Sequence, residues 1–224
     1  MNLESSKTLG GVGAILLLVG TLPVLSSYTF GVLALVGIIA ILVALNSLAN
    51  IYKERGIFNN SLYGLIAGVV GSVIAGVVVV VAVLSNLKSL LEQIYPSWNG
   101  QWSSVSSLSS MTPNTSNITL SNSTLISLLG GVLAAFVILW IFIIVWAIFV
   151  RRSLKMLAIK SSVGLFSTAA LLLIIGAALT IVVIGLLIMW IGVLLMVIAF
   201  FQIKPQAEQP PATMASPPST PTPV

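Results

Sequence analysis

The chain has 224 residues, of which 58% are hydrophobic and only 6% are charged, and its mean hydropathy is +1.17. A soluble domain carries about 25% charged residues, so this composition excludes a soluble fold. We predict an all-α, polytopic membrane protein, because a helix satisfies its own backbone hydrogen bonds within hydrocarbon.

The missing residue types exclude most catalytic chemistry. The chain contains no Cys, His or Asp, and its acidic residues are Glu4, Glu54, Glu92 and Glu208. Thiolate nucleophiles, disulfides, ordinary zinc sites and a Ser-His-Asp triad therefore cannot form. All four Glu lie outside the apolar stretches, so none is placed within the membrane to relay protons or bind a driving cation. We expect no catalytic residue, no cofactor, no metal and no nucleic-acid partner.

Charge-free apolar stretches mark the expected spans, since about 20 apolar residues cross roughly 30 Å of hydrocarbon. They predict a helical bundle of six transmembrane helices, at about 8–25, 30–51, 62–84, 125–150, 163–179 and 182–203. The last two come from one apolar run, 163–203, which would be about 60 Å long as a straight helix. This run must fold back, and we place the turn near Gly176 to Thr180. No Pro or Asn marks the turn, which leaves five to six spans.

The Lys and Arg positions predict the orientation, because cytoplasmic loops carry the positive charge. Eight of the nine fall on one side of the predicted bundle: Lys7, Lys53, Arg55, Arg151, Arg152, Lys155, Lys160 and Lys204. Lys88 falls on the other side. We therefore expect both termini in the cytoplasm and the loop 85–124 outside the cell.

Three N-glycosylation sequons agree with this orientation. They begin at Asn114, Asn117 and Asn122, all within the loop 85–124, and such sequons act as acceptors in exported surface loops. Triplets of this kind also arise by chance in a Ser/Thr/Asn-rich loop, but their clustering on the predicted outer side favours real acceptors. A fourth sequon, at Asn59, lies on the predicted cytoplasmic side and should be unmodified.

The loop 85–124 has its own pattern. Leu and Ile residues at helical spacing between 86 and 95 predict that the third span continues as an amphipathic helix. Tyr95, Trp98 and Trp102 then favour anchoring in the headgroup region over a ligand-binding role. A flexible, polar segment is expected from 103 to 124.

Small residues on the third span predict a close helix contact. Gly64, Gly68, Ser72 and Gly76 form a stripe with four-residue spacing, and such stripes let two backbones approach in lipid. A partner in the same chain is favoured over a second protein. The candidate partner residues, on the fourth span, are Gly130, Gly131, Ala134 and Ala135.

Polar side chains within the spans are few. Asn46 and Asn50 lie one turn apart near the cytoplasmic end of the second span. They could line a small polar pocket, although helix-to-helix hydrogen bonding is the favoured role at this depth. Trp190 in the last span is expected to be structural, with its N–H satisfied inside the bundle.

The two ends of the membrane region resemble each other. Residues 14–20 align with 170–176, and residues 36–45 align with 191–200. Spans one and two would then correspond to spans five and six, as in a parallel repeat. Apolar sequences resemble one another easily, so the alignment alone does not establish a duplication. The remaining segment, 205–224, holds seven of the ten prolines and is predicted to be a disordered cytoplasmic tail.

Three segments carry a resemblance to a known family: Leu3–Leu16, Tyr52–Gly64 and Trp190–Pro205. Together they resemble an archaeal family of uncharacterised polytopic membrane proteins, domain of unknown function 996. The resemblance covers most of residues 1–205 and implies an archaeal plasma membrane and a helical bundle. It brings no catalytic residue, substrate or cofactor to this chain.

Two functions stay open at this point. The favoured hypothesis is a structural or accessory subunit that packs with other membrane proteins or with itself, because the intramembrane residues suit packing and not chemistry. The alternative is a channel or carrier for a neutral or lipophilic small solute, which the repeat and the two span-two asparagines allow. An intramembrane enzyme is least favoured, since no acid-base pair lies within the spans. The lipid bilayer is a partner in each case.

Overall fold

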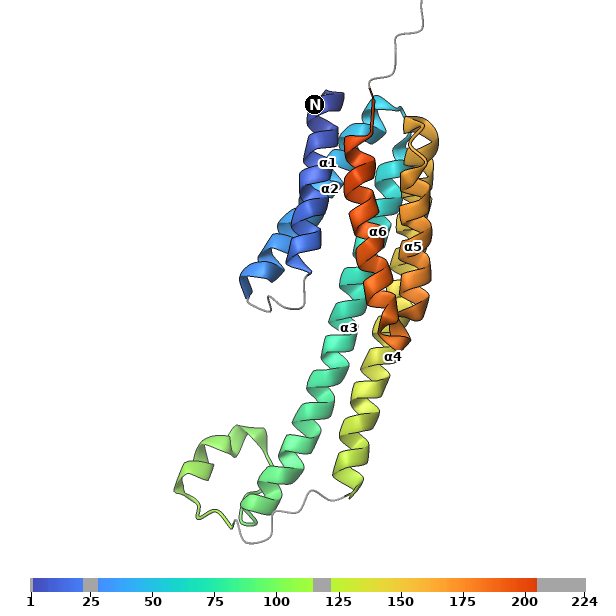
Figure 1. Cartoon of the computed structure of the whole chain (residues 1–224). Coiled ribbons are helices and arrows are strands. Elements are labelled where there is room, and N and C mark those ends of the chain that lie inside the picture. Colours follow the sequence, from blue (N-terminus) through green and yellow to red (C-terminus); the bar gives the residue numbers. More distant parts are fainter. Residues whose placement is uncertain (1, 22–27, 115–121, 205–224) are drawn as a thin grey trace, which may run out of the picture.

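The computed structural model of the chain describes residues 2–21, 28–114 and 122–204 and is all-helical over these ranges (Figure 1). Its elements are α1 (Leu3–Gly20), α2 (Tyr28–Ile51), α3 (Arg55–Ile94), η2 (Trp102–Ser110), α4 (Asn122–Ser161), α5 (Leu165–Leu179), η3 (Thr180–Val182) and α6 (Ile184–Phe201). Six of them, α1 to α6, are long and apolar enough to cross a membrane. The predicted all-α class with six such helices is confirmed.

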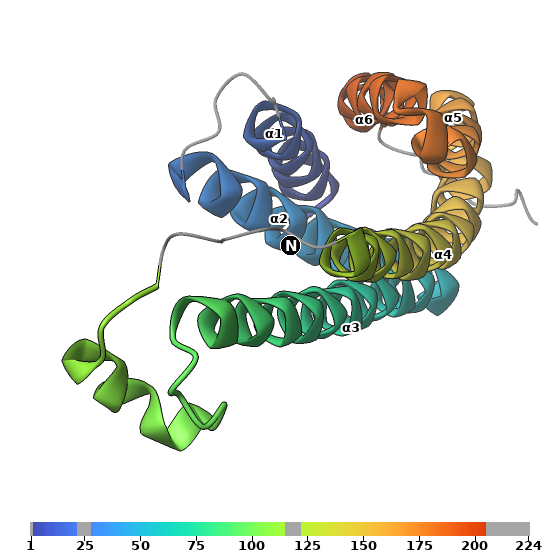
Figure 2. The same ribbon diagram turned by 90° about the horizontal axis from the view of Figure 1, so that it is seen from below.

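The six long helices form three antiparallel hairpins in a ring. α1 pairs with α2, α3 with α4 and α5 with α6; α2 touches α3, α4 touches α5, and α6 returns to α1 (Figure 2). Helices α3 and α4 have 40 residues each and extend well past the other four (Figure 1). Both run beyond the predicted spans 62–84 and 125–150, because the polar residues that flank each apolar stretch continue the same helix.

The main core lies at the end of the bundle where α1 begins and α6 ends. Phe166 on α5 and Phe200 on α6 are fully buried and meet edge to face, with ring centroids 5.1 Å apart. Aromatic pairs in this geometry contribute about 0.5–1.5 kcal/mol beyond their buried area. Gly10 on α1 lies against the Phe200 ring so closely that any side chain at position 10 would collide with it. This contact joins the first hairpin to the last.

The turn between α5 and α6 lies at Thr180–Val183 and so begins at the last residue of the predicted range. Val183 has φ of 66°, a left-handed conformation that a β-branched residue rarely adopts. The Thr180 hydroxyl donates to the carbonyl of Gly176 at 2.8 Å, and Gly185 packs directly on the Gly176 backbone. A buried hydroxyl and two glycines therefore make a turn that neither Pro nor Asn marks in the sequence.

The first and last hairpins use equivalent residues for their internal contacts. Gly37 on α2 packs against the backbone of Gly13 on α1, and Gly192 on α6 packs against the backbone of Ala169 on α5. In the sequence alignment Gly37 matches Gly192. Gly13 and Ala169 also correspond, because each lies immediately before the first residue of the aligned segments 14–20 and 170–176. The aligned pairs that are buried in both hairpins are Ala14 and Ala170, Ile41 and Met196, Ala44 and Ala199, and Leu45 and Phe200. The parallel repeat thus has a structural counterpart that apolar sequence similarity alone did not provide.

Part of the loop 85–124 folds as a cap on the far end of α3. Helix α3 continues to Ile94, as the amphipathic pattern predicted, but 102–110 is a 3-10 helix where a flexible segment was expected. Trp98 is 5% exposed and its indole N–H donates to Ser104 at 2.9 Å, so its ring is enclosed by the loop and does not anchor in headgroups. Gly100 has φ of 72° and lies against the Glu92 side chain of α3, which leaves no room for a Cβ at position 100. Trp102 remains 45% exposed.

Candidate functional site

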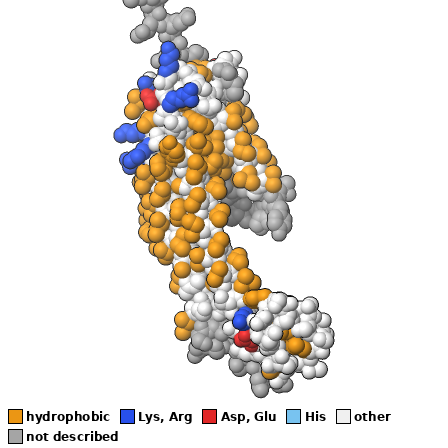
Figure 3. Space-filling model, turned by 180° about the vertical axis from the view of Figure 1, so that it is seen from behind, with side chains coloured by type: hydrophobic (Ala, Val, Ile, Leu, Met, Phe, Trp, Pro, Cys, Tyr) orange, Lys and Arg blue, Asp and Glu red, His pale blue; other side chains and the backbone are white. Residues whose placement is uncertain are grey.

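Eight of the nine basic residues gather at one end of the bundle, which we name the basic end. Antiparallel pairing brings the start of α1, the α2–α3 turn, the last turns of α4 and the end of α6 to this end. Figure 3 shows the blue side chains clustered there on one face. Lys88 lies at the far end of α3, 3.8 Å from Glu92. The predicted one-sided grouping is present; the compartment that the basic end faces stays a prediction.

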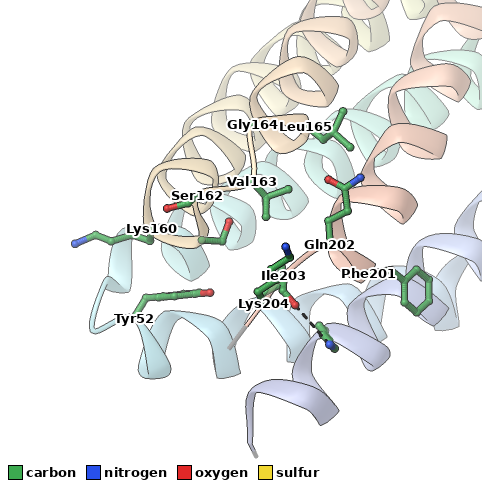
Figure 4. Close-up of a pocket in the computed structure, with 12 residues that line it drawn as sticks. Tyr52, Lys160, Ser162, Val163, Gly164, Leu165, Phe201, Gln202, Ile203 and Lys204 are labelled. Carbon is green, nitrogen blue, oxygen red and sulfur yellow. Dashed lines mark hydrogen bonds between the residues drawn. The ribbon is translucent and has the colours of Figure 1, made fainter. Parts of the chain in front are cut away.

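A hollow of about 1020 Å³ opens at the basic end (Figure 4). Its floor and walls come from the α4–α5 connection, the end of α6, the start of α1 and Tyr52 at the end of α2. The α4–α5 connection turns sharply because Ser162 takes a φ of 57°. The polar residues that line the hollow are Lys7, Tyr52, Lys160, Ser161, Ser162, Gln202 and Lys204.

The charge around the hollow is positive. Lys7 Nζ lies 2.8 Å from Glu4 Oε1 and donates to the Ile203 carbonyl at 3.5 Å, while Lys160 Nζ lies 3.6 Å from Glu54 Oε2. Lys204 has no ion pair within the described ranges. Exposed ion pairs of this kind are weak, so an anionic group that enters the hollow can compete for the ammonium groups.

The remaining polar side chains of the hollow, from Tyr, Ser and Gln residues, can donate hydrogen bonds. Burial raises the pKa of the Tyr52 phenol above its ordinary value, so this side chain stays protonated, and Figure 4 shows its hydroxyl pointing toward Ile203. Ammonium, phenol and hydroxyl groups together suit binding of an anion. None of the described residues that line the hollow is a carboxylate. The arrangement therefore favours an anionic group over a cation.

Pairs of serine hydroxyls join neighbouring helices near the basic end, and none of these residues is among the sites predicted from the sequence. Ser61 on α3 donates to Ser153 Oγ on α4 at 2.7 Å, and Ser153 donates to the Ile57 carbonyl at 2.5 Å. Ser6 on α1 and Ser47 on α2 share a 2.7 Å hydrogen bond. Their signal in the sequence is a Ser at the helical spacing of buried apolar neighbours.

The predicted packing stripe on α3 is only half in the contact with α4. Gly64 lies against Phe149 and Val150, and Gly68 against Trp146, but Ser72 and Gly76 are exposed. A four-residue spacing drifts by about 40° per step around a helix with 3.6 residues per turn, so the stripe leaves the interface after two members. The contact continues instead at Gly71 and Ala75 and, further along, Ala82 and Asn86, with the alternating three- and four-residue steps typical of left-handed packing.

Helix α4 is the partner that the sequence proposed, with a similar correction. Gly131 packs directly on Ala82, and Ala135 is 4% exposed. Gly130 has open space around it, and Ala134 is exposed. Only one residue of each adjacent pair can face α3, because neighbours along a helix point about 100° apart.

The predicted polar pocket is not formed by the two asparagines. Asn46 and Asn50 are both exposed on α2, and neither lines the hollow at the basic end. On the same helix Ala44, Leu45 and Leu48 are buried in the core, so the two amide side chains lie on the outer side. Trp190 behaves as expected: its N–H donates to the Leu18 carbonyl of α1 at 3.3 Å.

The three candidate glycosylation residues are described to different extents. Asn114 is exposed, and its backbone N–H donates to the Ile94 carbonyl at 2.7 Å, which holds the loop against the end of α3. Asn117 lies outside the described residues. Asn122 is the first residue of α4, and its side chain also lies outside the described part.

The fold defines a class of protein: an all-helical bundle whose six apolar helices indicate a membrane-embedded protein. Among the described residues there is no group of three or more His, Cys, Asp or Glu side chains that could hold a metal ion. The family described as protein of unknown function (DUF996) matches residues 33–199. The chain belongs to this family, and the resemblance noted in the sequence is confirmed.

One relative is similar over a shorter stretch. An uncharacterised protein of Methanocaldococcus jannaschii is 38% identical over 71 residues, which is 31% of this chain and 36% of that protein. The similarity therefore spans only about a third of the relative. No solved structure matches the chain.

Proposed function

We propose that this protein is a non-enzymatic, multi-pass protein of the plasma membrane that acts as a structural or accessory subunit, packing against other membrane proteins or a second copy of itself. The observation that carries this proposal is the outer face of α3. α3 packs against α4 on one side, whereas six large apolar residues on the opposite side are 44–60% exposed: Ile66, Val69, Val73, Val77, Val80 and Leu84.

This outer face suits a protein partner. Val and Ile side chains hold few rotamers, so a ridge of them loses little entropy when a second helix docks. Ser72 and Gly76 lie beside the ridge, and Gly76 has nothing within 4 Å of the place where a Cβ would be. Close backbone approach at small residues drives helix association in lipid, so a partner helix could lie directly against this side of α3.

The alternative, a channel or carrier for a neutral or lipophilic solute, has less support. Its candidate residues, Asn46 and Asn50, are exposed on the outside of α2. This alternative is tested by measuring solute flux in proteoliposomes. Flux through the unsubstituted protein that is lost in Asn46→Leu or Asn50→Leu would favour a channel or carrier.

The proposed orientation places the basic end in the cytoplasm and the capped end of α3 outside. Eight cations at one end support it through the positive-inside rule. Mass spectrometry of the peptide that carries Asn114, Asn117 and Asn122 checks it: glycans are expected there and not on Asn59. Glycans on Asn59 instead would reverse the orientation.

The accessory role is tested by gentle solubilisation of native membranes, native-gel separation and mass spectrometry of the co-migrating chains. A stoichiometric partner, or a defined self-assembly, is expected. Gly76→Leu should release it, because the new side chain fills the open outer face without touching the fold. Gly130→Leu is the matched control, since Gly130 on α4 also has open space and lies on the helix that does not carry the ridge. A chain that migrates alone before any substitution would contradict the proposal.

A further inference from the structure

The turn between α5 and α6 ends in an apolar tip, which we define as residues 179–187. The large apolar side chains exposed there are Leu179, Ile181, Val182, Val183, Ile184, Leu186 and Leu187, at 39–70%. The polar side chain of the tip, Thr180, is buried and donates within the hairpin. Turns in water are built from Gly, Pro, Asn, Asp and Ser, and burying apolar area from water is favourable. A tip of this composition is therefore suited to hydrocarbon.

A hydrogen bond sets the depth of the tip relative to α4. The indole N–H of Trp140 donates to the carbonyl of Ala178 at 3.3 Å, so the tip lies at the level of Trp140. Val150, the last apolar residue before the arginines, is about 15 Å from Trp140 along the helix. In the other direction the apolar run of α4 continues to Leu125, about 22 Å away. The tip thus lies near the middle of an apolar stretch that suits a hydrocarbon layer of roughly 30 Å.

Helix α5 gives a similar depth independently. Ser167 and Thr168 are exposed near its start, so this level suits headgroups and water. From Thr168 to Thr180 the helix rises about 18 Å, with exposed Leu171 and Ile175 between them. Counted from Leu165 to Val182 the segment is long enough to cross a membrane, but the part beyond the exposed hydroxyls of Ser167 and Thr168 is shorter than the roughly 30 Å of hydrocarbon.

A turn inside hydrocarbon is unfavourable when its backbone N–H and C=O groups lack hydrogen-bond partners. In this turn several of these groups have partners nearby. The Trp140 indole N–H donates a hydrogen bond to the Ala178 carbonyl, and the Thr180 hydroxyl donates one to the Gly176 carbonyl. The Val183 N–H donates to the Thr180 carbonyl, and the Leu186 N–H donates to the Val183 carbonyl, both at 3.0 Å.

We infer that α5 and α6 form a re-entrant hairpin, which enters and leaves the membrane at the basic end and holds its tip against lipid acyl chains near the middle of the bilayer. Helices α3 and α4 reach the opposite face, and α5 and α6 do not. This holds whichever compartment the basic end faces, and it does not depend on the proposed accessory role.

Site-directed spin labelling tests this hairpin, and the natural absence of Cys makes each introduced cysteine unique. Thr168→Cys, Ile175→Cys and Val183→Cys are labelled with a nitroxide in vesicles of phosphatidylcholine and phosphatidylglycerol. Collision with oxygen, which enriches in hydrocarbon, is compared with collision with a water-soluble nickel chelate. Ser109→Cys, in the exposed part of η2, is the water-exposed control.

The ratio of oxygen to nickel collisions should rise from Thr168 through Ile175 and be highest at Val183, severalfold above Ser109. If the hairpin crossed the bilayer, the ratio would peak near Ile175 and fall at Val183, which would overturn the inference. Low collision with both reagents at Val183 would mean a protein contact at the tip and would also overturn it. A thermal melt of each labelled chain that matches the unsubstituted protein shows that the label has not unfolded the hairpin.

Discussion

Gly37 on α2 lies so close to Gly13 on α1 that a Cβ atom at position 37 would come within 2.6 Å of the Gly13 carbonyl oxygen. In the equivalent contact of the last hairpin, a Cβ on Gly192 would lie 3.3 Å from the carbonyl oxygen of Ala169. The first hairpin is therefore packed backbone to backbone. The last hairpin keeps the same register but leaves more room.

This difference predicts unequal effects of the same substitution. Gly37→Ala should lower the free energy of unfolding by about 1–3 kcal/mol, the usual range for overpacking, whereas Gly192→Ala should have a smaller effect because Leu173 can give way. Gly31→Ala on α2, where nothing lies within 4 Å, is the control and should be neutral or stabilising by up to about 1 kcal/mol. Thermal unfolding in detergent, followed by circular dichroism, checks this. Equal losses at positions 37 and 31 would contradict the backbone contact.

The serine pair between α3 and α4 should contribute measurably to stability. Ser153→Ala removes both the bond from Ser61 and the bond to the Ile57 carbonyl, and a buried hydrogen bond contributes about 0.5–1.5 kcal/mol net. We expect a loss of that size per bond in the same unfolding assay. Ser72→Ala, whose exposed hydroxyl bonds within its own helix to Val69, should change little. A larger loss for Ser72 than for Ser153 would show that the pair is not formed.

Trp140 should hold the α5–α6 hairpin in place. Trp140→Phe leaves the Ala178 carbonyl without its donor. This carbonyl lies at an exposed surface of the protein that the proposed hairpin places in hydrocarbon, where an unsatisfied polar group costs about 1–3 kcal/mol or more. Hydrogen exchange followed by mass spectrometry should show faster exchange in the peptide that covers 176–186. Trp146→Phe is the matched control: it makes the same change in a side chain that forms no hydrogen bond with a described residue. In this variant hydrogen exchange at 176–186 should be unchanged. Equal acceleration by both variants would attribute the effect to packing alone.

Stability at alkaline pH should depend on Tyr52. Its pKa in the folded state is raised by burial above the ordinary value of 10.0. The unfolded chain therefore loses this proton first as the pH rises, and the folded state is destabilised progressively above about pH 10. Tyr52→Phe removes this contribution, so the variant should lose less stability than the unsubstituted chain between neutral pH and the alkaline range. Parallel pH profiles for the two proteins would contradict the burial of the phenol.

The sequence by itself determined the class of protein, six apolar helices and the gathering of basic residues at one end. These properties depend on composition and length: a run of apolar residues must form its hydrogen bonds as a helix in hydrocarbon, and alternation of direction brings Lys7, the α2–α3 turn and Lys160 to one side. The first members of the α3 stripe, Gly64 and Gly68, were also correctly placed on the face toward α4.

Only the tertiary structure decided which face of each helix is buried and how deep each helix reaches. Ser72 and Gly76 rotate out of the α3–α4 contact because a small phase difference accumulates along a helix, and Asn46 and Asn50 face outward because their neighbours fill the core. The level of the α5–α6 tip follows from one hydrogen bond, from Trp140 to Ala178, between residues 38 positions apart. Such facts depend on the packing of one helix against another, which hydrophobic length and charge alone do not specify.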